Sequence, residues 1–185
     1  HVAALRAIPN VNVFRPADAI ETLECWQLAL QADKTPSVLA LTRQGLPAVR
    51  DYEERNLCAN GAYELASGGK DPQVTIMASG SEVEIALQAR EQLKQEGVEA
   101  RVVSVPCMEL FDQQADSVKA DVLGDTPVRI AVEAAIQMSW DRYLRPQDRF
   151  IGMEAFGASA PAAQLFEHFG ITAEAIVETA RKALA

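Results

Sequence analysis

Apolar residues in the second half of the chain form short runs, separated by stretches with helical periodicity. A similar run at residues 38–42 is apolar without alternation, which suits a buried strand of a parallel sheet. Strands and helices that alternate at this spacing predict a three-layer α/β/α domain with a mostly parallel sheet over residues 72–185. The expected strands are residues 74–78, 101–105, 128–132 and 150–153.

Helix boundary signals accompany this pattern. Ser81 and Glu84 have the spacing of a capping box at the start of a helix over 81–96, and Gly97 stands where a C-terminal cap belongs. Thr172 is the expected N-cap of the last helix, which runs to Leu184. Further helical segments are expected near residues 116–123, 140–144 and 161–169.

The first 45 residues predict a strand, a helix and a second strand. The strands are expected at 11–14 and 38–42, and Asp18 with Glu21 forms a second capping-box pattern. This βαβ unit is too small to close a core, so we interpret residues 1–45 as the remnant of a larger domain. Residues 46–71 are expected to form a linker with one short strand near 61–67. The helix face expected to be buried carries Ile20, Leu23, Gln27 and Leu30.

The composition of the chain limits the binding partners and the cellular compartment that we expect for this protein. The formal net charge is −9, which disfavours nucleic acid and anionic membrane surfaces as partners. No apolar run approaches the roughly 20 residues needed to span a bilayer, and no signal peptide opens the chain. The three widely spaced cysteines favour a reducing cytoplasm over a disulfide framework. His1 opens the chain without an initiator methionine, as expected of a sequence that begins inside a larger protein.

Thr42 and Arg43 lie at the carboxyl end of the buried strand predicted over 38–42, where open α/β sheets place their ligands. The planar guanidinium group of Arg43 could bind a phosphate there, with the hydroxyl of Thr42 as a further hydrogen-bond donor. The sequence pattern alone favours an ordinary surface arginine.

The other candidates have simpler interpretations. Residues 78–82 could present backbone N–H groups to a phosphate, but Ser81 is explained as a helix cap and Glu82 would repel an anion. Glu133, close to Trp140, could be a perturbed acid or base, and we favour a hydrogen-bonded interface residue. His168 is interpreted as a packed or capping side chain. We therefore expect no catalytic, cofactor-binding or metal-binding residues that form a self-contained site.

Several sequence motifs occur together and in order along nearly the whole chain. The most specific is the run from residue 156 (FGASAP) through 165–170 (LFEHFG) to 176–177 (IV). The others are residues 5–10 (LRAIPN), 14–18 (FRPAD), 41–44 (LTRQ), 78–83 (ASGSEV), 100–106 (ARVVSVP) and 111–114 (FDQQ). As a set, these motifs resemble the transketolase family.

The resemblance implies that residues 1–45 are the end of a pyrimidine-binding domain and that 72–185 are a C-terminal domain. It implies a cytoplasmic homodimeric enzyme of the pentose phosphate pathway that transfers a two-carbon ketol unit between sugar phosphates. Thiamine diphosphate and a divalent metal (Mg²⁺ or Ca²⁺) would be held by upstream residues, so none is expected on this segment, which should be inactive in isolation. Arg43 resembles the substrate-phosphate arginine of the family, and Thr42 replaces its usual serine. Asp18 is better interpreted as a helix cap than as the family's substrate-binding aspartate.

Two other classes of protein stay open at this point. Related thiamine enzymes, a 1-deoxyxylulose-5-phosphate synthase or the beta subunit of a 2-oxo acid dehydrogenase, share the domain order, but residues 156–169 fit them less well. A free-standing α/β domain that binds a ligand or partner is the alternative from a different class. A naturally split transketolase subunit is less expected, because the break would fall inside the pyrimidine domain.

Overall fold

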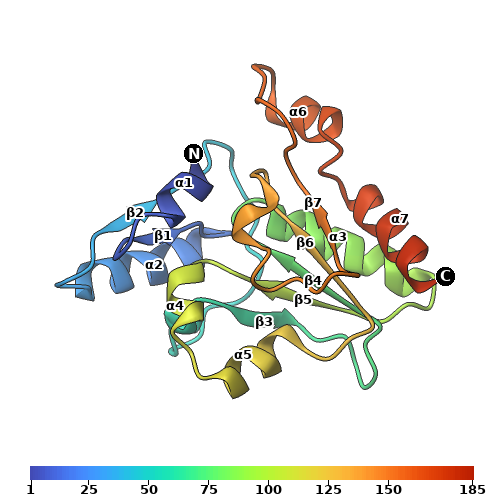
Figure 1. Ribbon diagram of the computed structural model, residues 1–185, viewed down its shortest axis with the longest axis horizontal. Helices are drawn as coiled ribbons and strands as arrows, with labels where there is room; N and C mark the ends of the chain where they lie inside the picture. The colour runs from blue at the N-terminus through green and yellow to red at the C-terminus, as the bar shows by residue number, and fades with distance from the viewer.

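The larger of two sheets organises most of the molecule. A computed structural model describes all residues from His1 to Ala185 (Figure 1). The five-stranded sheet has the order β3-β5-β4-β6-β7, in which only β3 runs antiparallel to its neighbour. The mostly parallel sheet expected from the sequence is confirmed. Its strands are β3 (Tyr63–Ala66), β4 (Val74–Ala78), β5 (Ala100–Ser104), β6 (Val128–Val132) and β7 (Arg149–Ile151).

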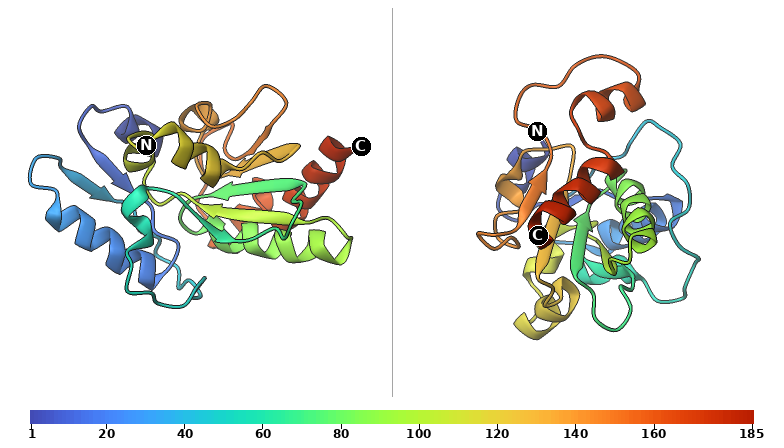
Figure 2. Two further views of the ribbon diagram at one scale, coloured as in Figure 1. Left: turned by 90° about the horizontal axis from the view of Figure 1, so that it is seen from below. Right: turned by 90° about the vertical axis from the view of Figure 1, so that its right-hand side faces the viewer.

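Helices cover both faces of this sheet, which confirms the three-layer prediction. One face packs on α3 (Glu82–Gln95) and α7 (Ala173–Leu184), and α6 (Ala162–His168) precedes α7 in the chain. The opposite face packs on α4 (Met108–Asp112) and α5 (Asp116–Leu123). Figure 2 (left) shows the sheet between these two helical layers. Alternate residues of one strand serve the two cores: Ile76 faces α3, whereas Met77 faces α4. None of the helices combines the length and the apolar composition that a membrane span requires.

Of the three helix caps expected in the C-terminal region, two agree with the structure and one differs. Thr172 accepts a hydrogen bond from Ala175 N at 3.2 Å, so the predicted cap of α7 is confirmed. Gly97 adopts φ +78° just after α3, as its predicted role requires. The capping box of Ser81 and Glu84 is wrong, because Ser81 has helical backbone angles and its hydroxyl donates to Glu82 Oε1 instead.

The segment expected to be a linker contributes a strand to the large sheet. The short strand predicted near 61–67 is present as β3, and it pairs antiparallel with β5 as an edge strand. A 3₁₀ helix, η1 (Leu57–Asn60), precedes it, and Gly61 adopts φ +79°. A Cβ atom at Gly61 would lie 2.2 Å from Phe111 N, so the close approach of α4 requires glycine there.

The N-terminal residues form a separate βαβ unit, which lies to the left in Figure 1. It consists of α1 (Val2–Arg6), β1 (Asn12–Phe14), α2 (Ala19–Gln31) and β2 (Ser37–Leu39). The two strands are parallel, as predicted. Asp18 Oδ1 accepts from Glu21 N at 2.8 Å, which confirms the cap, whereas Glu21 Oε2 accepts from Ala17 N at 2.7 Å.

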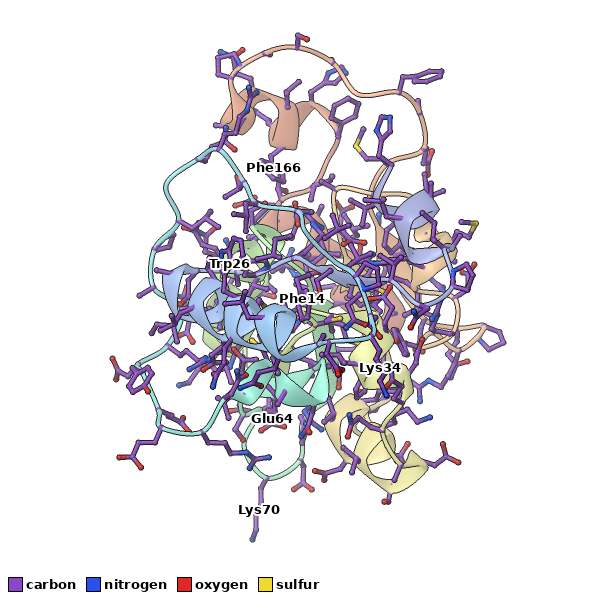
Figure 3. All side chains as sticks on the ribbon, turned by 90° about the vertical axis from the view of Figure 1, so that its left-hand side faces the viewer. Phe14, Trp26, Lys34, Glu64, Lys70 and Phe166 are labelled. Carbon is purple, nitrogen blue, oxygen red and sulfur yellow. The ribbon has the colours of Figure 1, made fainter.

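The expected buried face of α2 is wrong. Leu23 and Leu30 are 61% and 79% exposed. The helix can be found in Figure 3 by the label of Trp26, which is also exposed. The buried residues are instead Glu21, Glu24 and Cys25. Helical periodicity shows which residues share a face but not which face packs inward. Here, polar partners on neighbouring segments make burial of the two glutamates possible.

The three cysteines converge although they are far apart in sequence. Cys25, Cys58 and Cys107 are buried free thiols that share one cluster with Phe14 and Tyr63. The hydrogen bond with Cys25 and burial raise the pKa of Cys58, and burial together with the nearby Glu109 raises that of Cys107. This cluster joins the βαβ unit to the large sheet.

Candidate functional site

Arg43 lies in an exposed loop just beyond β2. Its side chain forms no ion pair in this structure. Thr42 Oγ1 donates to Gln44 Oε1 at 2.8 Å and accepts from Gln44 N at 3.3 Å, so the two flanking residues brace each other. The guanidinium group is therefore open to solvent at the carboxyl edge of the small parallel sheet, where a ligand could reach it.

The far end of this loop is fixed to the rest of the molecule. Val49 N donates to Asp18 Oδ2 at 3.0 Å, so Asp18 both caps α2 and holds the loop. Arg50 pairs with Glu24 at 2.6 Å and donates through Nε to the hydroxyl of Tyr63 at 2.9 Å. These contacts support the interpretation of Asp18 as a structural residue.

Glu133 is the centre of a buried charged cluster. Its carboxylate is fully buried and accepts hydrogen bonds from Arg6 Nη1 and Nη2 at 2.8 and 3.0 Å, and from Arg15 Nη1 at 2.6 Å. Trp140 Nε1 donates to Oε2 at 2.8 Å. Burial alone would raise the pKa of Glu133, but Arg15 and Arg6 outweigh it and lower the pKa. A carboxylate held ionised by two arginines suits a hydrogen-bonded interface residue better than an acid or base.

Glu82 extends the same cluster from the start of α3. Its Oε2 lies 3.0 Å from Arg15 Nη2, and the side chain is fully buried. Burial raises its pKa, Arg15 opposes this effect and the negative charge of Glu133 adds to it. An acidic side chain buried at the start of α3 leaves no place for a phosphate there, so residues 78–82 do not form an anion site.

Arg6 and Arg15, the partners of Glu133, are not predicted by the sequence pattern. Each pair joins residues more than a hundred positions apart, and no local spacing signals such a contact. The available signal was the position of the charges: Glu82 and Glu133 each follow a buried apolar strand, and a charge in such a place needs a partner.

His168 is exposed, and its ring meets Phe169 edge-on with centroids 4.8 Å apart. The structure contains no group of three or more His, Cys, Asp or Glu side chains arranged to hold a metal ion. The side chains present do not fit a metal-bound diphosphate, because the buried arginines are already paired with glutamates.

A groove of about 770 Å³ separates α1 from the segment that carries α6. Most of its lining is apolar, and Phe156 at its rim is 98% exposed. Figure 3 labels Phe166, another lining residue, on α6. The lining offers few polar groups, so the groove contributes no chemistry to a catalytic site.

Comparison with known proteins identifies two successive family domains along the chain. Residues 61–172 match the transketolase-like C-terminal domain, and residues 1–49 match the transketolase pyrimidine-binding domain. A transketolase from Cereibacter sphaeroides is 54% identical over 98% of the chain. A chloroplastic transketolase from Arabidopsis thaliana is 44% identical over the same share. The chain spans about 28% of the length of the first relative and 25% of the second.

Solved structures show the same architecture. A transketolase from Leishmania mexicana superposes with a TM-score of 0.88 at 42% identity, covering 98% of this chain and 26% of that one. A split-gene transketolase, described as an inactive beta4 tetramer, superposes with a TM-score of 0.81 at 25% identity, covering 99% of this chain and 61% of that one. The match to the C-terminal family domain covers more than half of the residues of this chain. The chain therefore belongs to the transketolase family.

Proposed function

We propose that this chain is the C-terminal part of a transketolase, which transfers a two-carbon ketol unit from a ketose phosphate to an aldose phosphate. The observation that carries the proposal is the ordered match of the pyrimidine-binding and C-terminal family domains along one chain. Solved transketolases from Pichia stipitis that share its fold include complexes described with xylulose-5-phosphate and sedoheptulose-7-phosphate. Sugar phosphates are the corresponding substrates proposed here.

Arg43 is the residue of this segment that we assign to the substrate. Its exposed guanidinium at the carboxyl edge of the small sheet is free to form a bidentate pair with a phosphate group. Thr42 has a minor role in this proposal, because its hydroxyl is engaged with Gln44. No catalytic residue is assigned to the chain.

The remaining machinery belongs to other parts of the full-length enzyme in this proposal. Thiamine diphosphate supplies the carbanion chemistry when bound, and with its divalent metal, Mg²⁺ or Ca²⁺, it is held outside these residues. The assembly is a cytoplasmic homodimer of the pentose phosphate pathway. We propose residues 1–45 as the end of the pyrimidine domain, 46–71 as a connection that contributes β3, and 72–185 as the C-terminal domain.

The role of Arg43 can be tested in a full-length transketolase that contains this sequence. Arg43→Ala should raise KM for phosphorylated sugars by roughly 10–150-fold, because a charge-assisted contact is lost. Unphosphorylated sugars should be affected far less. Arg55→Ala is the matched control, since Arg55 is also exposed and forms no ion pair. An equal effect of Arg43→Ala on both classes of sugar would remove Arg43 from the site.

The proposal also predicts the behaviour of the 185-residue chain alone. Supplied with thiamine diphosphate, Mg²⁺ and sugar phosphates, it should show no ketol transfer, because it lacks a catalytic set of its own. A coupled assay for the product aldose phosphate or ketose phosphate measures this directly. Measurable turnover above a no-protein control would contradict the assignment of the catalytic residues to other segments.

A further inference from the structure

The topology of the large sheet defines a place where ligands are normally bound. From β4 the chain passes through α3 to β5 on one side of β4, and from β5 it returns through α4 and α5 to β6 on the other side. The connections therefore diverge between β4 and β6. In open α/β sheets, the crevice outside the carboxyl ends of two such strands is the usual ligand site.

In this protein two carboxylates flank that crevice. Glu82 follows β4 and Glu133 follows β6, and both side chains are fully buried. Two unpaired carboxylates could not remain ionised so far from water, because desolvation would cost several kcal/mol for each charge. Positive groups must therefore occupy the crevice.

The groups that occupy it come from the N-terminal unit. Arg15 reaches Glu133 at 2.6 Å and Glu82 at 3.0 Å, whereas Arg6 holds Glu133 through both terminal nitrogens. Two guanidinium groups thus balance two carboxylates. Trp140, which packs on the face of the sheet covered by α4 and α5, donates a further hydrogen bond to Glu133.

The backbone around the crevice also contacts Arg15 directly. Arg15 N donates to Pro106 O at 2.8 Å, and Gly80 N donates to Arg15 O at 3.0 Å. Gly80 adopts φ +66°, and a Cβ atom there would lie 3.1 Å from Arg15 Nη2. Glycine at this position allows the strand-to-helix loop to lie directly against the guanidinium group.

We propose that the crevice between β4 and β6 is a guanidinium-binding site whose resident ligand is the N-terminal unit of the same chain. The position at which a doubly wound domain binds a small molecule serves here to dock the preceding domain. Because Arg15 follows β1 and Arg43 follows the neighbouring parallel β2, docking at the crevice also orients the edge that carries Arg43.

Chemical rescue tests this proposal in the 185-residue chain. Arg15→Ala should raise the unfolded fraction by about 150- to 5,000-fold, because it removes the cationic partner of the buried Glu82 and one of the two partners of Glu133. Added ethylguanidinium, at concentrations well below those that denature proteins, should fit the vacated space. It should raise the Tm of the variant in a saturable manner, as expected of a ligand that binds only the folded state.

Three controls make the result specific. N-ethylurea, which has a similar shape but no charge, should not rescue the variant, and ethylguanidinium should not raise the Tm of the wild-type chain. Arg55→Ala should show neither the loss nor the rescue, because Arg55 is exposed and outside the crevice. Equal rescue by N-ethylurea, or no rescue by ethylguanidinium, would overturn the proposal.

A second variant covers the case in which Arg15→Ala does not fold. Arg6→Ala leaves Arg15 in place to balance part of the charge, and it should be rescued by the same cation. If both variants are unfolded when purified, refolding is followed by circular dichroism with and without ethylguanidinium. Recovery of the folded signal only with the cation supports the site, and failure to recover in every case overturns it.

Discussion

Two buried glutamates join the N-terminal unit to the large sheet, and they are stabilised in different ways. Glu133 and Glu21 are both fully buried. Glu133 is surrounded by two arginines and the Trp140 indole. Glu21 has only uncharged donors: the Tyr63 hydroxyl at 2.7 Å, the Ser104 hydroxyl at 2.6 Å and a backbone N–H at 2.7 Å. The two carboxylates accept hydrogen bonds from a similar number of groups. Two of the groups around Glu133 are positively charged, whereas all of those around Glu21 are neutral.

The pKa values of the two carboxyl groups move in opposite directions as a result. Burial raises the pKa of Glu21, and hydrogen bonds from Ser104 and Tyr63 only partly oppose it. Burial acts on Glu133 in the same direction, but Arg15 and Arg6 reverse the sign and lower its pKa. In this protein, three neutral donors do not offset the desolvation of a carboxylate, whereas two guanidinium groups do.

The largest expected difference follows from replacing Glu133 by its neutral isostere. Glu133→Gln removes the charge between the buried Arg6 and the largely buried Arg15, and it leaves Arg6 uncompensated. It should lower the free energy of unfolding by about 3–5 kcal/mol at pH 7, as for the loss of one partner from a buried ion pair. Urea unfolding followed by the fluorescence of Trp140 and Trp26 measures the change.

Glu99→Gln is the matched control for this variant, because Glu99 is exposed and its carboxylate forms no ion pair. It should change the free energy of unfolding by less than about 0.5 kcal/mol. If Glu133→Gln is as mild as the control, then the charge of Glu133 is not what stabilises the arginine cluster.

A smaller effect is expected where the donors are neutral. Tyr63→Phe removes the hydroxyl that donates to Glu21 and accepts from Arg50 Nε. The loss should be about 1–2 kcal/mol, because the buried hydrogen bond to Glu21 and the partly buried one from Arg50 are both removed. Tyr52→Phe is the control, since Tyr52 is 65% exposed. A loss as large as that of Glu133→Gln would mean that Glu21 is ionised and depends strongly on this donor.

The sequence predicted the fold well where the pattern is local and repeated. The strands β4, β5 and β6 are short apolar runs, and the caps Asp18 and Thr172 lie at their expected positions. These features depend on residues close together in the chain. The stripe of Leu23 and Leu30 shows the limit, because the choice of the inward face depends on partners that lie elsewhere.

The candidate site was predicted less completely, for the same physical reason. Arg43 could be placed beyond a strand from the sequence, since strand ends and loops are local features. The contacts of Glu133 could not, because Arg6 is 127 residues away and the pairing depends on how two domains meet. A buried charge predicts that a partner exists, but not which residue it is.

The smallest effect should come from Glu21→Gln, and its pH dependence provides the sharpest contrast. A pKa raised above the unfolded value of about 4.3 means that Glu21 contributes stability below that pH, and that this contribution is lost as the pH rises through its folded pKa. Glutamine cannot ionise, so the variant should cost less than about 1 kcal/mol at pH 4 and should gain on the wild type as the pH rises. Glu133→Gln should show the opposite pH dependence, losing stability relative to the wild type as the pH rises. The lowered pKa of Glu133 gives the wild type stability that is present above about pH 4.3 and is lost as the pH falls through the folded pKa. Urea unfolding between about pH 2.5 and pH 8 compares the two slopes, because the change for Glu133 falls below pH 4.3 and that for Glu21 above it. Parallel slopes would show that neutral donors stabilise a buried carboxylate as well as arginines do.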